Sequence, residues 1–111
     1  MSDVPGEGEQ IGLVWRIREG MAETYDRDHA SVWPTLERRM RELGLIRFSI
    51  FRRADLVFAH LVVTDYRAFT EAYAIDETAQ EWEKQWDDLL IVDNSDPETG
   101  WPERLVHVWS M

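Results

Sequence analysis

Two apolar segments joined by a short polar turn decide the fold: IRFSIF at residues 46–51 and LVFAHLVV at residues 56–63, with RRAD between them. The first segment alternates between apolar and other side chains, which is the pattern of a strand with one buried face. The second segment is apolar almost throughout and rich in β-branched residues, which favours a central strand. We therefore predict two consecutive strands of one sheet.

The residues on either side of this pair predict the rest of the architecture. β-branched and aromatic residues indicate strands, and apolar residues three or four positions apart indicate helices. In chain order, the predicted elements are a strand at 11–17, helices at 19–30 and 31–43, the strand pair, helices at 66–74 and 75–90, a polar loop at 92–102 and a last strand at 103–110.

The predicted order, β-α-β-β-α-β, is typical of a ferredoxin-like α+β domain, in which helices cover one face of an antiparallel sheet. We expect one such domain over residues 11–111, after a flexible acidic tail at residues 1–10. The other face of so small a sheet is often partly apolar, and a second copy packed against it buries that surface. We therefore expect a homodimer that forms through the sheet, of the dimeric α/β barrel type.

The composition limits the partners of this domain. The chain has 22 acidic against 12 basic residues and a net charge of −10, which disfavours nucleic acid and anionic lipid and favours a neutral or cationic small molecule. With no cysteine and three dispersed histidines, we expect no metal site. The glycines form no phosphate-binding loop. We see neither a signal peptide nor a membrane-spanning segment. The absence of cysteine fits a reduced compartment, so we expect a cytoplasmic protein.

The first candidate site is a stripe of ring side chains in TYDRDHASVWPTL, residues 24–36. Tyr25, His29 and Trp33 recur every four residues and so share one helix face. Core packing is the ordinary explanation of such a stripe. His29, however, lies near the predicted helix end among charged neighbours, where the helix dipole favours a protonated imidazole. It is therefore a candidate proton donor, with Tyr25 as a hydrogen-bonding residue for a substrate hydroxyl and Trp33 as a packing residue.

The second candidate site is the helical pair Trp82 and Trp86. Core packing is again the ordinary explanation, and the alternative is a platform on which an indole packs against the apolar face of a sugar ring. Glu83 would then accept hydrogen bonds from sugar hydroxyls, although a carboxylate on a helix more often faces solvent. His60 lies inside an apolar strand and is only a reserve candidate.

The segment YDRDHASVWPTLERRMRELG at residues 25–44 resembles the signature of the L-rhamnose mutarotase family, and the resemblance continues through FSIF, LVFAHLVV, Trp82 and DNS at residues 93–95. This resemblance implies a ferredoxin-like domain that dimerises through its sheets. It also implies an isomerase that interconverts the α and β anomers of L-rhamnose or a related monosaccharide without a cofactor. In the family pattern, the proton donor falls on His29, a sugar-contacting tyrosine on Tyr25 and the first tryptophan of a pair on Trp82.

Two positions depart from the family pattern. Glu83 stands in place of the second tryptophan of the pair, and Phe48 stands in place of a second sugar-contacting tyrosine. We therefore expect Glu83 and Phe48 to contact a differently arranged or more hydroxylated sugar. The second acid–base group stays open, with Glu83 and water as candidates. Two other functions also stay open: a cofactor-free monooxygenase or isomerase on the same dimeric fold, and a sugar-binding relative without activity.

Overall fold

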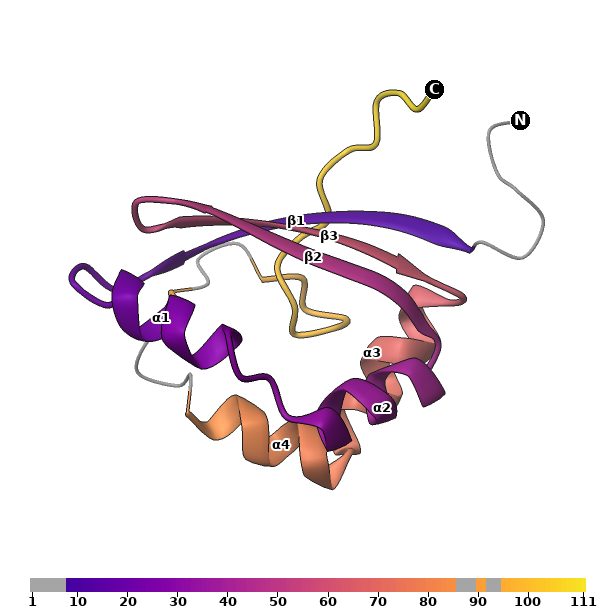
Figure 1. Ribbon diagram of the computed structural model, residues 1–111. Coiled ribbons are helices and arrows are strands. Elements are labelled where there is room, and N and C mark those ends of the chain that lie inside the picture. The colour runs from indigo at the N-terminus through magenta and orange to yellow at the C-terminus, as the bar shows by residue number, and fades with distance from the viewer. Residues whose placement is uncertain (1–7, 86–89, 92–94) are drawn as a thin grey trace.

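The computed structural model of the chain describes residues 8–85, 90–91 and 95–111. The described strands form one antiparallel sheet in the order β2-β3-β1-β4, and the described helices all lie against the same face of it (Figure 1). This is the ferredoxin-like arrangement that the sequence predicts. The elements are β1 (Glu9–Ile17), α1 (Ala22–His29), α2 (Pro34–Glu42), β2 (Leu45–Arg53), β3 (Leu56–Val63), α3 (Tyr66–Ile75), α4 (Glu77–Lys84) and β4 (Leu90–Ile91).

The strand pair from which the prediction starts forms a hairpin. Arg53 of β2 lies opposite Leu56 of β3, and Phe48 lies opposite Leu61. Ala54 in the turn has a positive φ of 53°. On its other side β3 pairs with β1 over eight successive positions. The prediction of a central strand is therefore confirmed.

The ends of α2 follow from two residues with special backbones. Pro34 is the first residue of the helix, where its missing N–H removes no intrahelical hydrogen bond. Gly44 follows the helix with a φ of 109°. A Cβ at this position would lie 2.4 Å from Thr64 Oγ1, so only glycine fits between α2 and the residue after β3.

The predicted last strand at residues 103–110 is wrong. This segment, which we call the C-terminal arm, crosses β1, where the N–H of Leu105 donates to the carbonyl oxygen of Gly12 at 2.8 Å. No strand of the described residues pairs with the arm. Its alternating apolar residues indicate a half-buried strand, but within one copy most of them, such as Val106, are exposed.

The fourth strand lies instead at the end of the predicted helix at 75–90. α3 ends at Ile75, α4 ends at Lys84, and β4 pairs with the C-terminal end of β1. Trp86 lies outside the described residues. Helical spacing is a local signal, whereas the pairing of β4 depends on the open edge of β1, which is distant in sequence.

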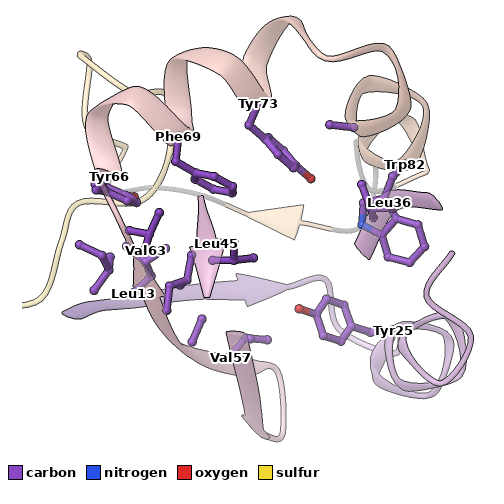
Figure 2. Close-up of a cluster of buried hydrophobic side chains, with 14 of the residues drawn as sticks. Leu13, Tyr25, Leu36, Leu45, Val57, Val63, Tyr66, Phe69, Tyr73 and Trp82 are labelled. Atoms are coloured by element: carbon purple, nitrogen blue, oxygen red, sulfur yellow. The ribbon is translucent and has the colours of Figure 1, made fainter. Parts of the chain in front are cut away.

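The core lies between the sheet and the helices (Figure 2). Leu13 and Leu61 of the sheet and Leu36 and Phe69 of the helices are at most 1% exposed. Burying each such side chain contributes roughly 1.5–3 kcal/mol to folding. The packing of these side chains therefore holds the helices on one face of the sheet.

The N-terminal boundary differs slightly from the prediction. β1 begins at Glu9, inside the predicted acidic tail, and residues 1–7 lie outside the described part of the chain. No described helix has the length and apolar character needed to cross a membrane.

Candidate active site

A cavity of about 570 Å³ opens between the sheet and the helices. This volume is in the range that small-molecule sites occupy. All the predicted site residues line it, although they come from α1, β2 and α4: Tyr25, His29, Phe48, Trp82 and Glu83. The tertiary structure therefore brings together side chains that lie more than fifty residues apart in the sequence. We call this space the sheet–helix cavity.

His29 is the last residue of α1 and is half-buried at the cavity wall. Its Nδ1–H donates to the carbonyl oxygen of Tyr25, one turn earlier, at 2.9 Å. Its ring also stacks on the ring of Tyr25, with 4.3 Å between the ring centroids. This hydrogen bond occupies Nδ1, so Nε2 is the ring nitrogen left to contact a substrate.

Trp82 supports the imidazole from the opposite helix. The centroids of the His29 and Trp82 rings are 5.7 Å apart in an edge-to-face contact. Trp33 also packs against the Trp82 indole, with 5.2 Å between the ring centroids. Trp33 does not line the cavity, in keeping with its predicted packing role. Because Trp82 is only 6% exposed, it presents a small part of its ring to the cavity.

Tyr25 is a neutral hydrogen-bonding group at the cavity wall. It is 3% exposed, and burial raises the pKa of its hydroxyl far above the usual 10.0, although the neighbouring indole of Trp15 acts in the opposite direction. The carboxylate of Glu83 raises the pKa further. The hydroxyls of Tyr25 and Tyr73 both point into the space between the sheet and the helices (Figure 2).

Tyr73 is a cavity residue that the sequence analysis missed. It lies on α3, and its hydroxyl donates to Glu83 Oε2 of α4 at 3.1 Å. Nothing in the local sequence signals this contact, because the two residues lie on different helices and at no helical spacing. Trp15 also lines the cavity from β1 and was likewise missed.

The remaining candidates take other positions. Phe48 contributes an apolar ring to the cavity from β2. His60 lies on the uncovered face of the sheet, where its Nε2–H donates to Gln10 Oε1 at 2.6 Å, and so it is remote from the cavity. The described part of the chain holds no group of three or more residues suited to binding a metal ion.

Comparisons with known proteins agree with this geometry. The structure is similar to the crystal structure of an L-rhamnose mutarotase from Formosa agariphila, with 20% sequence identity, a TM-score of 0.74, and coverage of 94% of this chain and 99% of that one. It is also similar to tetracenomycin F2 cyclase from Streptomyces glaucescens, with 18% identity, a TM-score of 0.64 and the same coverage. At these identities the two structures support the fold alone. No curated protein sequence matches the chain.

The family is decided by the sequence itself. The L-rhamnose mutarotase family model matches residues 10–111, almost the whole chain. The match confirms the resemblance carried by the Tyr-His-Trp-Pro segment. The chain therefore belongs to the L-rhamnose mutarotase family, which consists of isomerases that interconvert sugar anomers.

Proposed function

We propose that His29 is the proton donor for anomer exchange of L-rhamnose or a related neutral monosaccharide, in a reaction that uses no cofactor. The observation that carries this proposal is the position of His29: a half-buried imidazole, held by the Tyr25 carbonyl, at the wall of the sheet–helix cavity. The family match supports the reaction class.

The proposed reaction begins when Nε2–H of His29 protonates the ring oxygen of the sugar and the anomeric hydroxyl gives its proton to a second base, Glu83 or water, which returns it when the ring closes. The bond between C1 and the ring oxygen breaks, and an open-chain aldehyde forms. Rotation about the C1–C2 bond presents the other face of the carbonyl. The former ring oxygen then attacks C1, its proton returns to Nε2, and the new anomeric oxygen regains a proton. A positioned acid–base group of this kind typically accelerates a reaction by ~10²–10⁴-fold.

The other cavity residues would bind the sugar. Trp82 and Phe48 supply apolar surface for the C–H face of the ring, and the hydroxyls of the sugar would pair with Tyr25 and Glu83. The carboxylate of Glu83 and the net charge of −10 favour a neutral sugar over a phosphorylated one.

Exchange NMR on a panel of reducing sugars tests the proposal. The wild-type protein should accelerate the anomer exchange of at least one sugar, and His29→Ala should lose ~10²–10⁴-fold of that acceleration while its circular dichroism spectrum is unchanged. His60→Ala is the matched control, because this histidine lies outside the cavity, and it should keep the wild-type rate. Retention of the rate in His29→Ala would disprove the role of His29.

Two other results would contradict the proposal, and each would favour a different function. Sugar binding without any acceleration by the wild-type protein would make it a sugar-binding protein without activity. Oxygen consumption with an aromatic substrate, again without sugar exchange, would favour a cofactor-free monooxygenase on the same fold.

The proposal includes a homodimer that forms through the uncovered face of the sheet. Phe58 of β3 lies on this face, near the β2–β3 turn, opposite Val14 of β1 and Phe51 of β2. Phe58 is 41% exposed and Phe51 is 64% exposed, so an apolar row crosses the described strands without cover in one copy. A second copy would bury this row.

The proposal also places the protein in the cytoplasm. The chain has no cysteine, which fits a compartment where thiols stay reduced. Fractionation of the source cells with an antibody against the protein would test this, and recovery outside the cytoplasmic fraction would contradict it.

A further inference from the structure

We infer that Tyr73 and Glu83 form a recognition pair. The pair favours a sugar that carries a hydroxyl group at the position facing Glu83 over the corresponding deoxy sugar. In this pair Glu83 contacts the sugar, and Tyr73 is a positioning residue that holds the carboxylate. The inference rests on the proposed sugar exchange at His29, and it defines the class of sugar that this chain prefers.

The pair is built from two helices whose junction is fixed. Tyr73 lies near the end of α3, and Glu83 lies in the last turn of α4. Between the helices, the carboxylate of Asp76 accepts hydrogen bonds from the N–H of Ala79 at 3.0 Å and from Nε of Arg39 at 2.7 Å. This junction sets the direction of α4 relative to α3, and so it sets the distance across which Tyr73 and Glu83 meet.

The ring of Tyr73 is held by aromatic neighbours. Its centroid lies 5.6 Å from that of Phe69 and 5.3 Å from that of Trp101. The side chain is only 7% exposed. The hydroxyl therefore has a defined position at the cavity wall, from which it donates to Glu83 Oε2 at 3.1 Å. A carboxylate on a solvent-exposed helix would otherwise sample several rotamers.

The protonation of the pair fits recognition of a hydroxyl. Burial raises the pKa of Tyr73 far above its usual 10.0, and the charge of Glu83 acts in the same direction, so the phenol stays a hydrogen-bond donor. A carboxylate has two oxygens and about four acceptor positions. Glu83 can therefore accept from Tyr73 and from a sugar hydroxyl at the same time.

The surroundings turn this contact into a preference. Trp82 and Trp101 also line the cavity, and Trp101 packs against the ring of Tyr73. A deoxy sugar would place a methyl group or a hydrogen against the carboxylate, displacing water without replacing its hydrogen bond. Because the Glu83 side chain is exposed and water can still reach it, we expect a preference of only about tenfold for the hydroxylated sugar.

Matched sugar pairs that differ in one hydroxyl test this inference. Suitable pairs are L-mannose with L-rhamnose, L-galactose with L-fucose, and D-ribose with 2-deoxy-D-ribose. Exchange NMR gives kcat and KM for each sugar, and ligand-observed NMR titration gives its Kd. The wild type should prefer the hydroxylated member of at least one pair by about tenfold in kcat/KM.

The variants separate recognition from packing. Tyr73→Phe keeps the ring and removes the donor, so it should reduce the preference by raising KM for the hydroxylated sugar more than for the deoxy sugar. Glu83→Leu should abolish the preference. Tyr66→Phe is the matched control: it makes the same change on α3, at a buried hydroxyl that has no hydrogen-bond partner among the described residues and does not line the cavity. It should leave the preference unchanged.

The inference is overturned if the wild type has the same kcat/KM for both sugars of every pair. It is also overturned if Tyr73→Phe changes kcat/KM by the same factor for both sugars. Failure of the proposed function looks different, because the wild type would then accelerate no sugar. In that case the Kd values decide the inference alone: a preference that Tyr73→Phe reduces would support it, and equal Kd values or no binding would overturn it.

Discussion

At the scale of single residues, the ring of His29, the candidate proton donor, is positioned by its own helix and by the indole of Trp82. His29 donates from Nδ1 to the carbonyl oxygen of Tyr25, one turn earlier in α1. Trp82 meets the imidazole edge to face from α4. The ring is therefore restrained from two directions, and the proposed proton transfer requires a nitrogen held in one place in this way.

Tyr25→Phe tests the binding role of the neighbouring phenol. Removing one hydrogen bond to the sugar should raise KM about two- to tenfold and change kcat less, because the aromatic ring that supports His29 remains. Steady-state exchange kinetics with a thermal melt would check this. An equal loss of thermal stability and of activity, with KM unchanged, would instead identify Tyr25 as a packing residue.

At the scale of the elements, two charged contacts position the helices that carry the site. Arg52 of β2 donates from Nε and from one terminal nitrogen to the two carboxylate oxygens of Asp26, at 2.8 and 2.6 Å. This bidentate pair ties α1, and with it His29, to the sheet. Asp76 plays the corresponding part at the start of α4, where it caps the helix and binds Arg39 of α2.

Asp76→Ala should destabilise the fold more than Asp65→Ala. Both residues cap a helix through their side chains, but Asp76 also accepts a hydrogen bond from Arg39 at 2.7 Å. Loss of a cap costs about 1 kcal/mol of unfolding free energy, and we expect about 2 kcal/mol for Asp76. Chemical denaturation of both variants would check the difference, and equal losses would contradict a structural role for the Arg39 contact.

The stability that Asp76→Ala loses should depend on pH, and the pKa of Asp76 gives the direction. The backbone N–H of Ala79 and the guanidinium of Arg39 hold the pKa of Asp76 below its usual 3.8. A lowered folded-state pKa gives stability that is complete above about pH 4 and is lost as the pH falls through the folded value. The difference in unfolding free energy between the wild type and Asp76→Ala should therefore be smaller at about pH 3 than at neutral pH. A difference that stays constant would show that the carboxylate charge contributes nothing.

At the scale of the whole molecule, one copy leaves apolar surface uncovered on the side of the sheet opposite the cavity. The C-terminal arm carries Val106, Val108 and Trp109, which are 85%, 87% and 74% exposed. The arm leaves the sheet at Gly12 and projects away from the helices (Figure 1). Exposure of so many large apolar side chains in one short segment favours a contact with another molecule, and the proposed second copy would supply it.

Phe58→Asp should convert the proposed dimer to a monomer, because it places a charge within the apolar row on the uncovered face. Deletion of residues 106–111 should weaken the dimer. Ile75→Asp is the control: Ile75 is 78% exposed but lies at the end of α3, on the helical side. Light scattering after gel filtration would give the masses. A monomeric wild type would contradict the dimer, and dissociation by Ile75→Asp as well would contradict the proposed interface.

Local patterns in the sequence were sufficient for the order of elements as far as α4 and for much of the candidate site. A spacing of four residues places Tyr25 and His29 on one helix face in any surroundings, and the nearly continuous apolar run of β3 predicts a central strand. The family resemblance adds Trp82, Glu83 and Phe48, which no spacing connects to His29. The structure places all of them at one cavity, and their roles stay predictions.

The amino-acid sequence by itself determined the strand pair, the helices on one face and the helical stripe that carries His29, because these depend on periodicity within a few turns of chain. Only the tertiary structure decided that β4, and not the C-terminal arm, completes the sheet, and that Tyr73 meets Glu83 across two helices. Such contacts depend on which surfaces, distant in the sequence, lie together after packing. Local sequence patterns therefore do not predict them.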